Sequence, residues 1–218
     1  MGRSSTARDR LLSSACELMH TRGYAAIGVA EICARADVRK GSFYHFFPSK
    51  QALTAEVVNA HWQRQRIGWQ TALAAGAESG SDRGVPLAGV KRLERLVGWL
   101  VDGQRQAWEE TGRVDGCLLG NLAVELSSQE LGSQELGSQE LGGRGDGGDQ
   151  EPGIRRRLGA IFEEQAALIE SALGEGTRDV ARTVVAQIEG AVLMSRLAGD
   201  ITPLAGLWPA VRRLVAGP

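Results

Sequence analysis

Residues 23–53, GYAAIGVAEICARADVRKGSFYHFFPSKQAL, carry the strongest structural signal in the chain. A short helix is predicted to begin at Gly28, because Val29, Ile32 and Cys33 then fall on one inward face at helical spacing. Neither glycine nor proline interrupts this run before the pattern changes. The segment therefore begins with a short amphipathic helix.

The next residues predict a tight turn followed by a second short helix. The turn covers residues 36–38 and places Asp37 in a left-handed backbone conformation, which Asp tolerates better than most residues. A helix then runs from Arg39 to Phe47, and Pro48 ends it because proline cannot continue a helix. Two short helices joined by such a turn are typical of a helix-turn-helix.

A longer helix is predicted on each side of this motif. The first begins near Thr6, which can cap it, and ends before Gly23. On the other side, Ser49 is expected to cap a long helix that begins at Lys50 and ends near Ala75. The first 50 residues are therefore expected to form a three-helix domain.

The rest of the chain, residues 51–218, predicts further helices and no convincing strand. Apolar residues recur at helical spacing, and aromatic residues, which favour strands, make up only 5% of the sequence. The predicted helices here follow the one from Lys50 and cover residues 87–110, 117–126, 154–173, 177–198 and a last segment from Thr202. The expected fold is all-α, with about nine helices in two domains, 1–50 and 51–218.

Residues 128–142 are three tandem copies of SQELG. A five-residue period rotates successive leucines around a helix, so they never share one face. The glycines that follow add backbone freedom, and residues 128–152 are therefore expected to form a flexible loop. We interpret this loop as a surface insertion without function; a partner-binding segment is the alternative.

Charge is unevenly divided along the chain. Residues 1–50 hold 8 Lys and Arg against 4 Asp and Glu, a net of +4, whereas the remaining residues hold 17 against 22, a net of −5. A basic N-terminal domain on an acidic remainder favours contact between that domain and phosphate groups. Chance clustering of a few arginines is the alternative explanation.

Several classes of protein are disfavoured by what the sequence lacks. No apolar run resembles an export signal or membrane span, so we expect a cytoplasmic protein without membrane contact. Three widely spaced cysteines, Cys16, Cys33 and Cys117, indicate reduced thiols. The histidines do not cluster with them, so we expect no metal or cofactor. A glycine-rich phosphate loop and a Ser-His-Asp set are also missing, which argues against an enzyme.

Residues 23–53, with a second helix reading KGSFYHFF and a closing PSK, resemble the DNA-binding domain of the TetR family of repressors. The resemblance is strong over residues 6–55 and extends further through the number and order of helices. It implies that the helix from Arg39 to Phe47 lies in the major groove of double-stranded operator DNA. It also implies a homodimer, in which the last two helices of each chain form a four-helix bundle over a palindromic operator.

Residue chemistry within that resemblance predicts the DNA contacts. Arg39 and Lys40 can reach guanine edges or phosphate, and the choice between them stays open for Arg39. Gly41 lets the backbone approach the DNA closely, and Lys50 can bind phosphate at a helix N-terminus. Simple surface cover is the alternative for the polar side chains on the second helix. The predicted DNA-binding residues are Gly28, Arg39, Lys40, Gly41, Ser42, Tyr44, His45 and Lys50.

Two further segments, GCLLGNLAVELSS (116–128) and PGIRRRLGAIF (152–162), resemble one branch of the family, whose repressors respond to electrophilic or unsaturated small molecules. The pair Ile27-Gly28 fits that branch and removes a hydroxyl that commonly touches phosphate in the family. Cys117 matches the position of a reactive cysteine in the branch. The repeat loop departs from it, because the two segments lie almost together there.

The regulatory site is expected in the C-terminal domain. Cys117 is predicted in the first turn of the sixth helix, where amide dipoles raise the thiolate fraction; Asp115 opposes this and Arg113 offsets Asp115. Trp69 and Trp108 are candidate pocket residues, because large amphipathic rings can line a site for an apolar or aromatic ligand. Core packing is the alternative for both tryptophans, and non-covalent ligand binding is the alternative at Cys117.

These inferences predict a ligand- or electrophile-responsive transcriptional repressor. It would leave its operator when the C-terminal domain binds or reacts with a small-molecule inducer. A DNA-binding activator is the main alternative, because the DNA-binding domain alone cannot indicate the direction of regulation. A helical enzyme is the least supported alternative.

Overall fold

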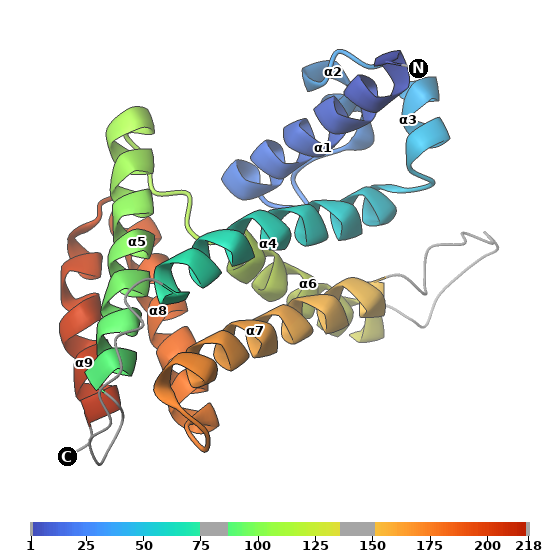
Figure 1. The fold of residues 1–218 in the computed structure, drawn as a ribbon. Coiled ribbons are helices and arrows are strands. Elements are labelled where there is room, and N and C mark those ends of the chain that lie inside the picture. The colour runs from blue at the N-terminus through green and yellow to red at the C-terminus, as the bar shows by residue number, and fades with distance from the viewer. Residues whose placement is uncertain (1, 75–86, 136–150, 217–218) are drawn as a thin grey trace. The chain divides into compact units, whose positions relative to one another are not determined.

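The computed structural model describes residues 2–74, 87–135 and 151–216. Within these ranges the chain forms nine α-helices, one 3-10 helix and no β-strand, which confirms the all-α prediction (Figure 1). The helices are α1 (Gly2–Arg22), α2 (Val29–Arg35), α3 (Lys40–Phe46), α4 (Lys50–Ala74), α5 (Leu87–Thr111), α6 (Leu118–Glu135), α7 (Glu151–Leu173), α8 (Arg178–Ala198), the 3-10 helix η1 (Thr202–Gly206) and α9 (Leu207–Ala216).

Packing divides the chain into two compact units. The head unit comprises Met1–Trp62 and Leu118–Gly159, and the body unit comprises Gln63–Cys117 and Ala160–Pro218. This division differs from the predicted boundary after residue 50, because α6, which packs against α1, and the start of α7 group with the N-terminal helices. Helices α4 and α7 each contribute residues to both units.

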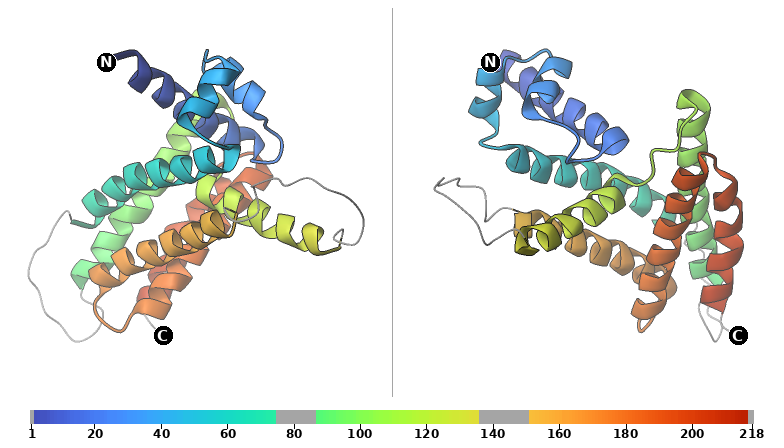
Figure 2. Two further views of the ribbon diagram at one scale, coloured as in Figure 1. Left: turned by 90° about the vertical axis from the view of Figure 1, so that its right-hand side faces the viewer. Right: turned by 180° about the vertical axis from the view of Figure 1, so that it is seen from behind.

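In the head unit, α2, α3 and α6 all contact α1 (Figure 2). Leu11, Ala15 and Met19 recur every four residues along α1 and are fully buried, so they form the stripe on which the other helices pack. Helix α1 begins at Gly2, earlier than predicted. Thr6 therefore lies inside the helix and does not cap it.

The predicted helix-turn-helix is confirmed in its local details. Gly28 precedes α2 as its N-cap, and Asp37, between α2 and α3, has a positive φ of 50°. The backbone N–H of Ala52 donates a hydrogen bond of 3.1 Å to Ser49 Oγ, so Ser49 caps α4 as expected. The turn at Asp37 comes just before α3, and the cap at Ser49 begins the next helix, α4, soon after α3 ends.

The body unit has an apolar core built from α4, α5, α7, α8, η1 and α9. Helix α9 packs against both α5 and α8 (Figure 1). Gly89 allows α5 to approach α7 closely: a Cβ added there would lie 2.6 Å from the carbonyl oxygen of Ala172. Gly68 on α4 likewise leaves room for the ring of Trp99 on α5.

Two sequence predictions about helix bounds were wrong, one in each unit. Helix α6 extends to Glu135, so residues 128–135 are helical, although a loop was expected from residue 128. Gln, Glu and Leu favour helix, and a helix already started can continue without a common apolar face. Residues 136–150 of the predicted loop lie outside the described residues. The last helix is also divided, with a 3-10 turn from Thr202 before α9.

Candidate DNA-binding surface and effector region

Helix α3 has one apolar and one polar side. Phe43, with Phe47 just after the helix, is fully buried and anchors α3 in the head unit. Tyr44 remains 53% exposed and packs edge-on against the Phe43 ring, with the ring centroids 5.2 Å apart. The exposed residues at and around this side are Arg39, Lys40, Gly41, Ser42, Tyr44 and His45. The structure therefore places six of the eight predicted DNA-binding residues on one short segment.

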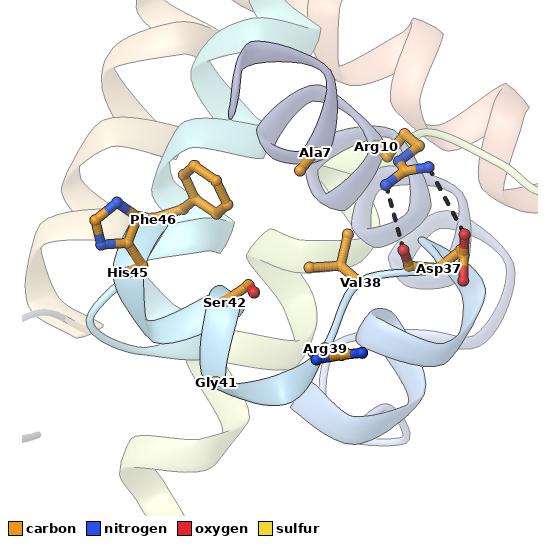
Figure 3. A pocket seen from close by; sticks show the side chains of 9 residues that line it. All are labelled: Ala7, Arg10, Asp37, Val38, Arg39, Gly41, Ser42, His45 and Phe46. Carbon is orange, nitrogen blue, oxygen red and sulfur yellow. Dashed lines mark hydrogen bonds and ion pairs between the residues drawn. The ribbon is translucent and has the colours of Figure 1, made fainter. Parts of the chain in front are cut away.

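An open depression of about 550 Å³ lies beside this segment (Figure 3). Its lining residues are Ala7, Arg10, Asp37, Val38, Arg39, Gly41, Ser42, His45 and Phe46. Arg10 Nη2 donates a hydrogen bond of 3.2 Å to the carbonyl oxygen of Asp37, and Nη1 lies 3.9 Å from Asp37 Oδ2. Arg10 therefore ties the left-handed turn to α1, a role that sequence reasoning missed because the two residues are far apart in the chain.

Most cations of the head unit have protein partners. The ion pairs are Arg8–Glu56, Arg22–Glu31 and Arg35–Glu17. The side chains of Arg39 and Lys40, in contrast, are exposed and form no ion pair or hydrogen bond with other described residues. Two unpaired cations at the start of α3 are therefore available to a polyanion.

Lys50 and Gly28 lie apart from this group. Lys50 Nζ donates hydrogen bonds of 2.8 Å to the carbonyl oxygens of Tyr24 and Ile27, and it lies 3.9 Å from the centroid of the Tyr24 ring. Burial lowers the pKa of Lys50, and the nearby Glu125 carboxylate partly opposes this. This geometry argues against the predicted phosphate contact of Lys50, because its ammonium group already binds the segment between α1 and α2. Gly28 is exposed at the start of α2.

In the body unit, Cys117 and Trp69 both contact the same apolar core. Trp69 is buried within it, and Cys117 is half-buried against it. Trp108 on α5 is half-buried but is not among the residues of this core. Cys117 lies just before α6, which begins at Leu118, so it is one residue short of the predicted first turn. The structure thus brings two of the three predicted sensing residues to one core.

Cys117 has an acidic neighbour that the sequence did not suggest. Burial raises the pKa of the Glu189 carboxyl group on α8, and a hydrogen bond with Cys117 partly offsets that rise. When it is ionised, the Glu189 carboxylate accepts a hydrogen bond from the Cys117 thiol. The expected pair of Arg113 and Asp115 is present, with Nη2 and Oδ2 3.6 Å apart.

Gln165 on α7 is a second polar group that sequence reasoning missed. It is only 1% exposed, and neither of its amide atoms has a hydrogen-bond partner among the described residues. Its helical neighbours Phe162 and Ile169 belong to the body core. Buried amide groups are normally hydrogen-bonded, so Gln165 is an exception within this core. A polar residue within an apolar stripe was the available signal.

The other two cysteines lie on helices of the head unit. Burial raises the pKa of the Cys33 thiol, with Lys40 opposing the rise, and Cys16 is half-buried on α1. In the described part of the chain, no three metal-binding side chains come together. No helix among those described combines the length and apolar character needed to cross a membrane.

Comparison with known proteins identifies the class. Residues 11–57 match the model of bacterial regulatory proteins of the tetR family, and these residues contain the helix-turn-helix described above. Residues 11–57 therefore form a DNA-binding domain of the tetR type, and the chain is similar to TetR-type regulators beyond it.

Particular relatives support this assignment. The chain is 32% identical to the HTH-type transcriptional repressor DhaR of Mycobacterium sp. (strain GP1) over 120 residues, 55% of this chain and 52% of that protein. It is 27% identical to the HTH-type transcriptional repressor NemR of Escherichia coli (strain K12) over 119 residues, 55% and 53% of the two chains. The chain thus spans about half the length of these relatives.

A solved structure extends the similarity to the whole fold. The crystal structure of E. coli NemR in its reduced form has a TM-score of 0.70 at 21% identity, covering 97% of this chain and 98% of that chain. The body unit therefore shares its helical architecture with a TetR-type regulator, although at this identity the likeness concerns the fold alone.

Proposed function

We propose that this chain is a homodimeric transcriptional repressor that binds a palindromic operator and is released when a small molecule binds or reacts with the body unit. The observation that carries the proposal is the exposed side of α3, where Arg39 and Lys40 have no protein partner. Unpaired cations beside exposed hydroxyl and imidazole groups can bind both phosphate oxygens and base edges.

In this proposal α3 enters the major groove, which is about 12 Å wide and admits an α-helix. Lys40 binds phosphate, and Arg39 binds either phosphate or a guanine edge. Ser42, Tyr44 and His45 face the bases or the neighbouring backbone from the same side. Arg10 supports this arrangement from α1 by holding the turn before α3.

Dimerisation is supported by an apolar surface on α8 and α9. The exposed apolar side chains there are Leu193 (51%), Met194 (57%), Leu197 (74%) and Leu214 (39%). Three of them follow one another at helical spacing on α8, so they form a continuous stripe. A second copy of the chain would cover this stripe and present two α3 helices about one DNA turn, or 34–36 Å, apart.

The effector is proposed to bind in the body unit, at the core bordered by Cys117, Trp69 and Gln165. Apolar and aromatic walls with a few polar groups suit a small apolar or aromatic molecule that carries a hydrogen-bonding group. Cys117 offers covalent attack on an electrophile as the second route. Trp108 remains a candidate from the sequence alone, and the protein is proposed to act in the cytoplasm.

DNA binding can be tested without knowing the operator. A duplex is selected from a random library by the wild-type protein, and its affinity is measured by fluorescence anisotropy at several salt concentrations. Lys40→Ala is expected to lower affinity for all duplexes and to reduce the salt slope by about one. Lys91→Ala, which removes the same charge from an exposed site on α5, is the matched control and should leave both unchanged. A monomeric protein, or one that selects no duplex, would refute the proposal.

The covalent route is tested separately. N-ethylmaleimide is added to the wild-type protein and to Cys117→Ser, and release of the selected duplex is followed by gel shift. Both proteins retain Cys16 and Cys33, so a difference between them reports Cys117 alone. We expect release only from the wild-type protein. Identical responses would eliminate the covalent route and leave non-covalent binding.

A further inference from the structure

Glu125 of α6 binds the segment that leads into the helix-turn-helix. Its Oε2 accepts a hydrogen bond of 2.7 Å from the backbone N–H of Tyr24, and its Oε1 accepts one from the N–H of Ala25. The two amides are consecutive, so one carboxylate satisfies both. Hydrogen bonds to an ionised acceptor are among the stronger ones in proteins.

The backbone before these amides is shaped for the carboxylate. Gly23 has a φ of +88°, a conformation that L side chains rarely adopt, and a Cβ added there would lie 3.0 Å from Glu125 Oε2. Glycine at this position therefore ends α1 and leaves space for the Glu125 side chain.

Lys50 binds the carbonyl groups of the same segment. Its ammonium binds the carbonyl oxygens of Tyr24 and Ile27, while Glu125 binds the amides of Tyr24 and Ala25. The Tyr24 side chain is itself 6% exposed. Both amide and carbonyl groups of the segment are thus bound by side chains of other helices, and the segment continues directly into Gly28 and α2. Its position sets where α2 starts.

We propose that Glu125 is a positioning residue for DNA recognition, because it fixes the segment 24–27 to α6 and thereby orients α2 and α3. This inference rests on the proposed DNA binding. All of the groups involved belong to the head unit. Helix α6 begins at the residue after Cys117, so Glu125 lies on the helix that follows the proposed sensing cysteine.

The test compares two variants that lose the same charge. Glu125→Gln keeps one acceptor oxygen but turns an NH2 group towards a backbone N–H, so at least one hydrogen bond is lost. We expect the Kd for the selected duplex to rise roughly tenfold. Glu109→Gln, exposed on α5, is the control. Removing a negative charge should by itself strengthen binding to DNA, so the expected loss is opposite in sign to the charge effect.

Three further readouts separate positioning from general damage. A scrambled duplex should bind wild type and Glu125→Gln equally, because phosphate contact does not need an oriented α3. Hydrogen exchange of the Tyr24 and Ala25 amides should accelerate in the variant while its unfolding temperature shows an intact fold. Glu125→Asp, which keeps the charge and both acceptors, should bind the selected duplex more tightly than Glu125→Gln.

The outcomes that overturn the inference differ from those that overturn the proposed function. Equal affinity of Glu125→Gln and wild type for the selected duplex overturns the inference alone. Equal losses on selected and scrambled duplexes, or tighter binding by Glu125→Gln than by Glu125→Asp, also overturn it. A wild-type protein that selects no duplex overturns the proposed function.

Discussion

At Gly41 in α3, alanine should stabilise the folded protein but weaken the proposed contact with DNA. A Cβ built at Gly41 meets no atom within 4 Å, so the protein itself has room for alanine. Alanine is favoured over glycine by about 0.8–1.0 kcal/mol inside a helix. Gly41 is the second residue of α3, so the gain in the free energy of unfolding is expected to be at most about 1 kcal/mol.

The expected effect of Gly41→Ala on stability is opposite in direction to its expected effect on DNA affinity. For a chain of 218 residues, a gain of about 1 kcal/mol raises Tm by about 2–4 °C. On DNA, the added methyl group would occupy space between the α3 backbone and the groove, at a cost of about 1–3 kcal/mol. Such a cost corresponds to a roughly 5- to 150-fold loss of affinity. One variant should therefore be more stable and bind more weakly.

The assay pairs thermal unfolding, followed by circular dichroism, with anisotropy titration of the selected duplex. Gly98→Ala on α5 is the control, because a Cβ at Gly98 also meets no atom within 4 Å but lies in the body unit. It should raise Tm without changing DNA affinity. If Gly41→Ala binds the duplex as tightly as the wild type, the α3 backbone does not approach DNA at this point and the proposed docking is refuted.

Three further predictions concern stability. Gly89→Ala would place its Cβ 2.6 Å from a backbone oxygen of Ala172, so α5 and α7 must separate; urea denaturation should show a loss of about 1–3 kcal/mol, where Gly98→Ala shows none. Burial raises the pKa of Glu189 above 4.5, so the native state binds this proton more tightly than the unfolded state, and the free energy of unfolding should fall as pH rises from 4.5 towards the native pKa. Glu189→Gln should flatten that fall, and an unchanged pH profile would contradict the buried carboxyl group. Lys50→Met should cost about 1–3 kcal/mol by leaving two carbonyl groups unpaired, with an unchanged salt slope of DNA binding; a smaller slope would instead support a phosphate contact.

The helix-turn-helix could be predicted from the sequence because its signals act over a few residues. The positive φ of Asp37, the cap at Ser49 and the burial of Phe43 each follow from local backbone preference or helical spacing. The repeat segment shows the limit of such reasoning, since periodicity favoured a loop whereas helix propensity prevailed as far as Glu135. Two local signals of opposite sign cannot be weighed without knowing what each side chain contacts.

The partners of single polar side chains came from tertiary structure. Lys50 looked like a phosphate ligand, yet its ammonium binds carbonyl groups within the head unit; Glu125, Glu189 and Gln165 carried no signal that predicted what each of them faces. Whether such a group meets a backbone amide, a thiol or nothing depends on which helices pack together, and those contacts join residues as far as 101 positions apart. Local preferences act along the chain, whereas the environment of a buried charge or amide is set by distant segments brought together by packing.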